Sequence, residues 1–378
     1  MKFLTCLTAA IALQLFFIQC QPQPHADAPS APKAIIGYVG GYRGAIDETT
    51  IDAAKLTHIN YAFVNVQDSL AVLTNLSTDS TNFRKLNTLK AINPELKILI
   101  SLGGWSWSEN FSDAVLTPGS REKFAASCVD IVRIYDLDGV DIDWEYPAVP
   151  GEEDNVVRPE DKENFILMFK TIREQLERLT ATTGKNYLLT TAVPIFQKFL
   201  DMNDLAAAAQ YLDLVNLMTY DFFVNGDTAG HHTNLYPSEN YDTEDSAHKG
   251  VQSYIAAGVP VEKLVIGMAF YGRSWYMRSA DNRGVNRPVD SLARTQGYTY
   301  IKDSILTRPG VVRYWDEKAQ AAYAFNEQNN QFFTFDDEES VKAKCTYVKE
   351  KGLAGVMFWE YHSDPKLYLL NAIHQNIR

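Results

Sequence analysis

Cysteine and histidine are scarce in this chain, and their scarcity excludes two ways of holding a protein together. Four cysteines in 378 residues cannot form the dense disulfide framework of a small secreted domain. Cys128 and Cys345 each continue an apolar stripe with helical spacing, so we expect both to be free thiols in the core. The histidines show no metal-ligand spacing, so we expect no metal and no cofactor, and we place His231 and His232 in a polar loop.

A run of basic residues is also missing. The chain carries 35 Lys and Arg against 47 Asp and Glu, which gives a formal net charge of −12. A surface that follows phosphates along a nucleic acid needs clustered positive charge. We therefore expect no nucleic-acid partner, and a neutral or cationic ligand fits the charge balance better.

A long apolar run stands at the N-terminus. Lys2 precedes the apolar residues 3–18, and a Pro-rich stretch follows. The run is shorter than the roughly 20 residues that span a bilayer, so residues 1–20 predict an export signal and residues 21–32 a tether. Cys20 is the expected first residue of a lipoprotein, which would be periplasmic or on the outer surface. A cut after Ala28, giving free secretion, is the alternative.

From residue 33 onward, short apolar runs alternate with helix-period segments, as in the βα units of a parallel sheet. We predict strands at residues 33–42, 56–66, 97–105, 139–146, 187–194, 214–222, 263–272 and 355–361. Eight such units predict an α/β fold, a (β/α)8 TIM barrel formed by residues 33–275 and 336–378. Residues 276–335 are too many for one crossover, so we expect a small α+β insertion domain there.

The stretch DGVDIDWEYP at residues 138–147 sets three carboxylates at alternate positions. Asp141, Asp143 and Glu145 would share one face of a strand, with apolar residues on the other face. Three carboxylates on an inward face cannot all ionise cheaply, so at least one pKa should be raised, as a proton donor near neutral pH requires. A calcium loop fits poorly, because Tyr146 stands where that loop needs glycine.

Aromatic residues stand at the expected C-terminal ends of several strands, where barrels of this kind place their reacting groups. Trp105, Tyr220, Tyr271 and Trp359 all follow apolar runs. Aromatic faces stack on sugar rings, and carboxylates carry out acid and base chemistry on the glycosidic bond. Together these residues indicate a glycoside hydrolase.

DGVDIDWE resembles the D-x-x-D-x-D-x-E motif of glycoside hydrolase family 18 chitinases of the bacterial type. Four further stretches match that family's strand-end motifs in order, namely SLGGW (101–105), MTYD (218–221), MAFYGR (268–273) and GVMFWEY (355–361). The resemblance covers essentially everything from residue 33 onward. It implies a chitinase that cleaves β-1,4 bonds between N-acetylglucosamine units by a retaining, substrate-assisted mechanism.

The resemblance also implies a role for individual residues. Glu145 would be the general acid, and Asp143, helped by Asp141, would orient and stabilise the substrate's N-acetyl group. Tyr220 would hold the acetamido oxygen, and Trp359 would form the floor under the sugar. Further substrate-binding residues implied by the resemblance are Tyr38, Phe63, Gly104, Trp105, Met218, Asp221, Tyr271 and Arg273.

Two other functions remain open for such a sequence. A chitin-binding lectin on the same barrel would bind without catalysis, although lectins of this family typically replace the acid that stands here as Glu145. An endo-β-N-acetylglucosaminidase acting on glycoprotein glycans is the other, although such enzymes usually lack the insertion. The expected partners are chitin or chito-oligosaccharides, the expected state is a monomer, and the only expected membrane contact is an N-terminal lipid anchor.

Overall fold

The computed structural model describes residues 32–378, apart from residue 225 and residues 241–242. The expected export signal and all but the last residue of the expected tether, with Cys20 and Ala28, lie outside the described residues. All of the helices and strands belong to the unit Lys33–Arg378. No helix in the described part of the chain is both long and apolar enough to cross a membrane.

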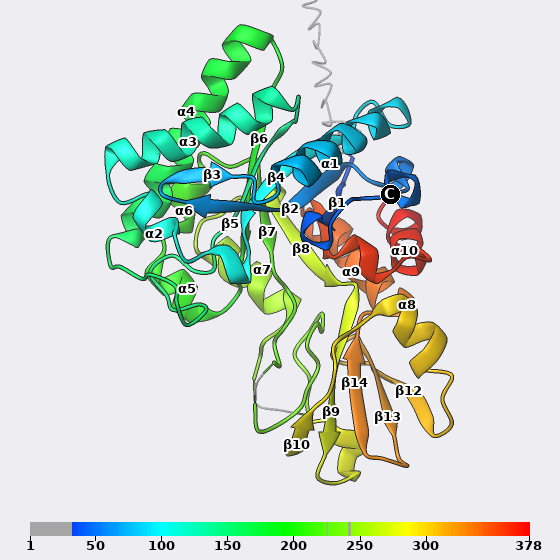
Figure 1. The fold of residues 1–378 in the computed structure, drawn as a ribbon. Helices are drawn as coiled ribbons and strands as arrows, with labels where there is room; N and C mark the ends of the chain where they lie inside the picture. The colour runs from blue at the N-terminus through cyan, green and yellow to red at the C-terminus, as the bar shows by residue number, and fades with distance from the viewer. Residues whose placement is uncertain (1–31, 225, 241–242) are drawn as a thin grey trace, which may run out of the picture. The chain divides into compact units, whose positions relative to one another are not determined.

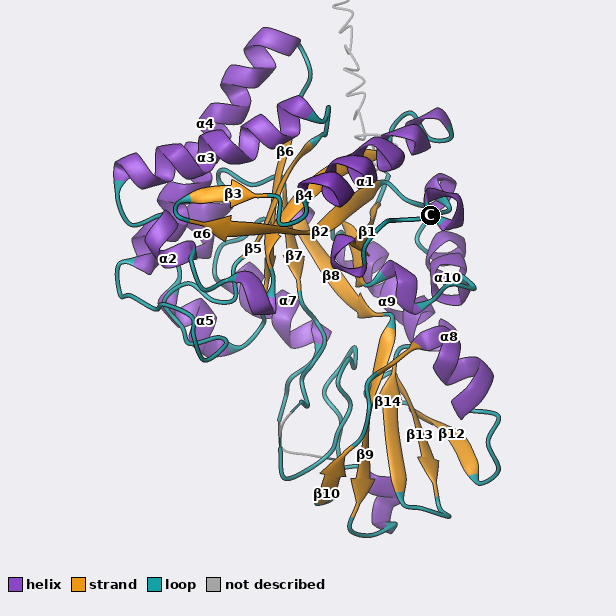
Figure 2. Ribbon diagram, viewed as in Figure 1, coloured by secondary structure: helices purple, strands orange, loops and turns teal. Residues whose placement is uncertain are grey.

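Eight parallel strands close into a barrel (Figures 1 and 2). They are β1 (Ala34–Gly40), β2 (His58–Gln67), β4 (Lys97–Gly103), β5 (Gly139–Asp143), β6 (Leu188–Val193), β7 (Leu214–Leu217), β8 (Leu264–Ala269) and β15 (Gly355–Trp359). Strand β1 pairs in parallel with both β15 and β2, and this double pairing closes the ring. The expected TIM barrel is confirmed.

The barrel strands are buried on both faces, because helices cover the outer face and side chains fill the interior. In β5, Val140 and Ile142 are fully buried in the main apolar core, while Asp141 and Asp143 occupy the alternate positions. This alternation is the one that the sequence predicted for the acidic strand.

Helices follow the barrel strands and lie around them (Figure 1). They are α1 (Leu76–Thr88), α2 (Phe111–Ala114), α3 (Pro118–Ile134), α4 (Asp161–Thr183), α5 (Gln197–Met202), α6 (Leu205–Ala209), α7 (Ala247–Ala256), α9 (Glu338–Lys351) and α10 (Tyr368–Asn376). Sequence signals fix several ends: the Thr117 hydroxyl caps α3 by accepting from the Ser120 amide, and Asp337 does the same for α9. Cys128 of α3 and Cys345 of α9 are buried free thiols, as expected.

A second, antiparallel sheet follows β8 and appears in the lower part of Figure 2. Its strands are β9 (Tyr271–Met277), β10 (Val289–Leu292), β11 (Gln296–Gly297), β12 (Val311–Asp316), β13 (Ala321–Asn326) and β14 (Gln331–Phe335), with the short helix α8 (Tyr298–Tyr300) between β11 and β12. Strands β13 and β14 pair around a turn at Asn330, which has a φ of 53°. A further short strand, β3 (Leu70–Val72), pairs with β2 outside this sheet.

Most strand ends differ from the sequence prediction by a few residues, most of all at β7, which was expected to reach residue 222 and ends at Leu217. Two further differences concern the site. Strand β5 stops at Asp143, the last residue paired with β4, and the Glu145 amide donates instead to the Ser108 hydroxyl at 2.9 Å. Glu145 therefore lies just beyond the strand. The strand expected at 263–272 ends at Ala269, because Tyr271 already belongs to β9 and pairs with the antiparallel sheet. The second sheet thus begins before residue 276.

Candidate active site

A cavity of about 930 Å³ opens at the C-terminal ends of the barrel strands. Most of the residues expected at the site line it, namely Phe63, Trp105, Asp143, Glu145, Met218, Tyr220, Asp221, Tyr271, Arg273 and Trp359. They come from strands far apart in the sequence, so the barrel brings them together. Tyr38, Gly104 and Asp141 do not line the cavity but contact or support residues that do.

Asp141 lies beneath the cavity and is fully buried. Its carboxylate accepts hydrogen bonds from Thr190 (2.5 Å), Ser101 (2.8 Å), Tyr38 (2.9 Å) and Asn216 (3.2 Å). Burial raises the pKa of Asp141, and these four donors oppose that rise. Tyr38, expected to contact substrate, is almost entirely buried and instead donates to Asp141.

Asp143 and Glu145 carry the acidic character of the cavity. Burial and the neighbouring carboxylates of Glu145 and Asp141 raise the pKa of Asp143 well above its ordinary value. Burial, together with the negative charges of Asp221 and Glu152, raises the pKa of Glu145 to about 7, although a hydrogen bond to Tyr146 acts in the opposite direction. Such a carboxyl holds a proton near neutral pH and can donate it.

Asp143 also has an unused hydrogen-bonding capacity. Its Oδ1 is buried and has no hydrogen-bond partner in the described part of the chain. Buried polar atoms are normally paired, and an exception at a cavity wall indicates a place where a ligand completes the bonding. The structure therefore offers Asp143 Oδ1 as an acceptor for a ligand N–H.

Backbone contacts hold the segment that carries these two carboxylates. The Gly104 amide donates to the Asp143 carbonyl, and Asn155 donates to the Glu145 carbonyl at 2.7 Å. Gly104 has a φ of 77°, and a Cβ at this position would lie 2.6 Å from the Phe63 ring. Gly104 is therefore required by backbone conformation and close packing, while the neighbouring Gly103 lines the cavity.

Asp221 lies at the opposite side of the cluster in a left-handed conformation, with a φ of 61°. Its Oδ1 accepts from Arg273 Nε (2.6 Å) and Tyr271 Oη (2.8 Å), and His232 Nδ1 lies 3.3 Å away. Burial alone would raise the pKa of Asp221, but the contacts with His232 and Arg273 hold it well below its usual range. Asp221 is therefore an ionised carboxylate, and its negative charge helps to raise the pKa of Glu145.

Tyr220 stays protonated, because burial and the surrounding carboxylates raise the pKa of its hydroxyl. Its ring packs edge-on against Tyr271, with centroids 6.1 Å apart. The hydroxyl lies 3.9 Å from the Met357 sulfur, a weak acceptor. It is therefore available to donate a stronger hydrogen bond to a ligand oxygen.

The apolar floor of the cavity is a group of stacked aromatic rings. Trp359 stacks on Phe63 (5.5 Å between centroids, 19° between planes) and on Tyr42 (6.3 Å, 17°), and Tyr38 packs against it at 54°. Trp105 is half exposed at the rim, 6.4 Å from Tyr146. Extended aromatic surfaces of this kind complement the apolar faces of sugar rings.

Several lining residues were missed by the sequence reasoning, namely Tyr42, Trp107, Tyr146 and Phe196. Trp107 and Tyr146 lie within two residues of expected site residues, so adjacency was an available signal. Phe196 follows β6, whose end showed no aromatic or acidic cluster in the sequence. Its position becomes evident only when the barrel places β6 beside β5.

His231 and His232 lie in a loop, as expected, but both side chains are buried rather than exposed on a polar surface. His231 Nε2 lies 3.1 Å from Asp316 Oδ2, and His232 faces Asp221. Each histidine lies against a carboxylate from another part of the fold, which the sequence could not indicate. Within the described residues, no group of three or more His, Cys, Asp or Glu side chains is arranged to hold a metal ion.

Comparison with known proteins identifies relatives along nearly the whole described chain. Residues 34–364 match the family described as Glycosyl hydrolases family 18. Chitinase A1 of Niallia circulans is 34% identical across all of this chain and 62% of its own length, so this chain spans less than two thirds of that relative. Mouse Chitotriosidase-1 is 34% identical over 82% of this chain and 67% of its own.

Among solved structures, one from Paenibacillus barengoltzii is described as a family 18 N-acetylglucosaminidase. It superposes with a TM-score of 0.84 and 40% sequence identity, covering 91% of this chain and 99% of its own. These comparisons confirm the expected family and enzyme class.

Proposed function

The chain belongs to glycosyl hydrolases family 18, and on that premise we propose that the protein hydrolyses the β-1,4 bonds of chitin and chito-oligosaccharides. One observation carries the proposal: two buried carboxylates, Asp143 and Glu145, line a cavity with an aromatic floor, and the pKa of Glu145 is raised to about 7. An acid that is protonated near neutral pH above a sugar platform suits the protonation of a glycosidic oxygen.

In the proposed reaction, Glu145 gives its proton to the glycosidic oxygen as the C1–O bond breaks. The acetamido oxygen of the same sugar attacks C1 and forms an oxazolinium ion. Asp143 accepts the acetamido N–H through its unpaired Oδ1 and stabilises the positive charge, while Tyr220 donates to the acetamido oxygen. Water then attacks C1, gives a proton to Glu145 and opens the oxazolinium ring, which restores the acetamido group. Because C1 is inverted in both steps, its anomeric configuration is retained overall.

The arrangement of the carboxylates supports substrate assistance. Asp143 ends β5, Glu145 lies two residues further along the chain and both line the same cavity, so we infer that they approach a bound sugar from the same side. A retaining enzyme with a protein nucleophile needs its two carboxyl groups about 5–5.5 Å apart on either side of the scissile bond. The substrate's own acetamido group supplies the nucleophile that this layout lacks.

Substrate binding would follow the aromatic floor. We propose that the sugar at the cleavage point stacks on Trp359, with Phe63, Trp105, Met218, Tyr271 and Arg273 around it and with Asp221 oriented toward the acid. Tyr38, Gly104 and Asp141 support these contacts from below. Tyr42, stacked on Trp359, extends the platform by one ring.

Release of single N-acetylglucosamine units is a second candidate, because the Paenibacillus structure that is 40% identical to this chain is described as an N-acetylglucosaminidase. The deciding experiment is a timed product analysis on chitohexaose and on a high-mannose glycopeptide, with proton NMR of the fresh anomers. Mixed short oligomers with the β-anomer first support the chitinase. Monomer alone supports the second candidate, cleavage of the glycopeptide supports a glycan-specific enzyme, and binding without products supports a lectin.

The organisation and location of the protein are part of the proposal. Residues 33–275 and 336–378 would form the catalytic barrel and residues 276–335 the insertion domain of a monomer. Residues 1–20 would direct export, and Cys20 would become the lipidated start of a periplasmic or surface lipoprotein. Mass spectrometry of the mature N-terminus tests this: an unmodified start at Pro29 would instead support cleavage after Ala28 and free secretion.

A further inference from the structure

His232 occupies an unusual place between the active site and the core. The residue belongs to the loop that follows β7, and its ring is fully buried with Nδ1 3.3 Å from Asp221 Oδ1. Tyr271 and Arg273 reach the same carboxylate oxygen from β9. His232 thus contacts Asp221 from the same loop, whereas Tyr271 and Arg273 reach it from the second sheet.

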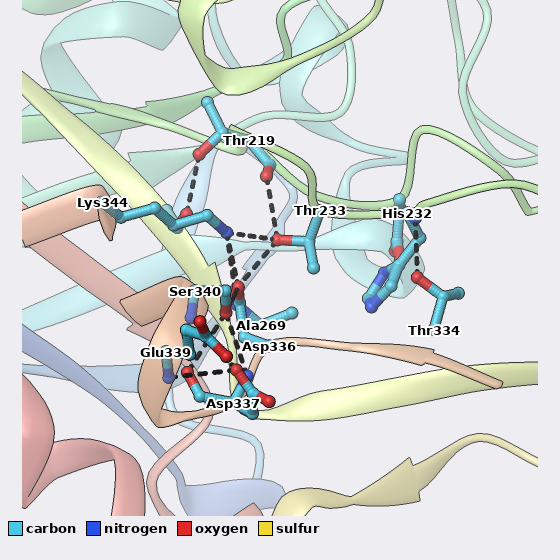
Figure 3. Close-up of polar contacts among 12 residues, drawn as sticks. Thr219, His232, Thr233, Ala269, Thr334, Asp336, Asp337, Glu339, Ser340 and Lys344 are labelled. Carbon is cyan, nitrogen blue, oxygen red and sulfur yellow. Dashed lines mark hydrogen bonds and ion pairs between the residues drawn. The ribbon is translucent and has the colours of Figure 1, made fainter. Parts of the chain in front are cut away.

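The backbone of His232 is fixed on both sides. Its amide donates to the Thr334 hydroxyl of β14 at 3.1 Å (Figure 3). Its carbonyl accepts from the Phe222 amide at 3.2 Å. Phe222 is the residue directly after Asp221. The backbone of His232 is therefore hydrogen-bonded to the residue next to Asp221, and its ring contacts Asp221 itself.

A buried ion pair anchors the next residue along the chain. Lys344 Nζ lies 2.7 Å from the Asp336 carboxylate and 2.7 Å from the Thr233 hydroxyl, and the Ala269 amide donates to Asp336 at 3.0 Å (Figure 3). Both charged side chains are fully buried. Because α9, β8 and the loop meet at this pair, the segment at Thr233 cannot shift without breaking it.

We propose that His232 is a positioning residue of this cleft, which donates from Nδ1–H to the Asp221 carboxylate and holds it in place opposite Glu145. The inference rests on the proposed function only for its effect on catalysis. Asp221 can only accept when ionised, so the single N–H of a neutral His232 ring lies on Nδ1. Nε2 is buried and has no hydrogen-bond partner in the described part of the structure, which agrees with an unprotonated nitrogen there.

The charged and titratable groups around His232 favour this neutral form. Burial lowers the pKa of the ring, and the positive charge of Arg273 acts in the same direction, while Asp221 and Asp336 oppose both. Tyr271 packs against the ring at 5.3 Å. The negative charge of Asp221 in turn raises the pKa of Glu145, so its exact placement affects the proton donor.

The test compares two adjacent buried histidines. His232→Leu removes the donor to Asp221, and His232→Asn keeps an N–H donor close to the position of Nδ1. His231→Leu is the matched control, because His231 is equally buried and lies 3.1 Å from a carboxylate, that of Asp316, which does not line the cavity. Thermal unfolding of all three variants measures the purely structural cost.

We expect His232→Leu to lower kcat on chitohexaose about tenfold, the rate equivalent of one hydrogen bond to a charged group. The acidic limb of the kcat/KM profile should move to higher pH, because Asp221 loses a contact that keeps its pKa low. His232→Asn should have most of the parent's kcat, and the acidic limb of its kcat/KM profile should lie close to that of the parent. His231→Leu should lower the melting temperature without moving the limb.

Titration of 13C-carboxyl-labelled aspartate by NMR supplies a readout that needs no turnover. The Asp221 signal should titrate at higher pH in His232→Leu than in the parent, whether or not chitin proves to be the substrate. An unchanged Asp221 titration, or an equal change in His231→Leu, would overturn the inference. Absence of chitohexaose cleavage by the parent would count against the proposed function alone.

Discussion

Carboxylates are buried at both ends of strand β5, but their pKa values are shifted in opposite directions. At its start, Asp138 lies 2.7 Å from Lys90 and 2.9 Å from Lys185 and accepts from the Ile98 amide, so its pKa is lowered despite burial. At its far end, Asp143 and Glu145 form no ion pair with a cation in the described part of the chain, and both pKa values are raised.

The buried pair of Asp336 and Lys344 repeats the arrangement at the start of β5. Its carboxylate lies against a cation at full burial, and it sits where the barrel meets α9. Asp138 and Asp336, each buried against a lysine, thus lie at structural junctions, whereas Asp143 and Glu145, which have no such partner among the described residues, line the cavity. This difference matches the general tendency of perturbed acids to gather at functional sites.

Substitution of the acid at the far end of β5 gives the largest expected effect. Glu145→Gln keeps the shape and removes the transferable proton, so kcat on chito-oligosaccharides should fall about 10²–10⁴-fold while the circular dichroism spectrum is kept. The matched control is Asp138→Asn at the other end, which should lower stability and retain most of kcat. Near-normal turnover by Glu145→Gln would remove it from the role of acid.

Asp143→Asn should have the next largest effect. The amide retains the size of the side chain but cannot lose a proton to become the anion that would face the oxazolinium ion, and loss of one such electrostatic contact typically costs about 10²–10³-fold in rate. Single-turnover measurements on chitohexaose isolate the chemical step. A rate within a factor of a few of the parent would show that the acetamido group does not depend on Asp143.

Breaking the buried ion pair of Asp336 and Lys344 should instead lower the stability of the folded protein. Lys344→Met leaves Asp336 buried without its cation, which typically costs about 3–5 kcal/mol in the free energy of unfolding. Urea denaturation measures this loss, and the double variant Lys344→Met/Asp336→Asn should recover part of it because the buried charge is gone. If the single variant were as stable as the parent, Asp336 and Lys344 would not form a structural junction.

The barrel and most of the site could be predicted from the sequence, because both depend on local patterns. Buried parallel strands appear as short apolar runs, and the acidic and aromatic residues stand at their ends. Asp143 and Trp359, the last residues of β5 and β15, line the cavity for this reason. In β5, the alternation of acidic and apolar residues in the sequence was enough to predict which side chains lie in the apolar core.

What could not be predicted depends on contacts between distant segments. His232 reads as a polar residue until the loop folds beneath β14 and meets Asp221. Tyr38 stands at a strand position suited to substrate, yet its hydroxyl is taken by Asp141. Tyr271 and Arg273 look like the end of a barrel strand but belong to the second sheet. Hydrogen-bond partners, rather than residue types, decided each case.

The smallest expected effect concerns the stability cost of the acid itself. The pKa of Glu145 is raised from 4.5 to about 7 in the folded protein, so the folded state binds this proton more tightly than the unfolded chain. The group's contribution to the free energy of unfolding is therefore complete below about pH 4.5 and is lost as the pH rises through about 7. The full loss is at most about 3.5 kcal/mol, since the two pKa values differ by about 2.5 and one pKa unit corresponds to about 1.4 kcal/mol.

Glu145→Gln lacks this titration, so it should gain stability relative to the parent as the pH rises from 5 to 8. Urea unfolding at four pH values measures the difference, and Glu163→Gln on the exposed face of α4 is the control, for which the difference should stay flat. Parallel pH profiles for Glu145→Gln and the parent would mean that the acid's pKa is not raised by folding. A widening difference would show that burying Glu145 without a cation lowers the stability of the folded protein at neutral pH. Asp138, which is paired with Lys90 and Lys185, carries no such cost.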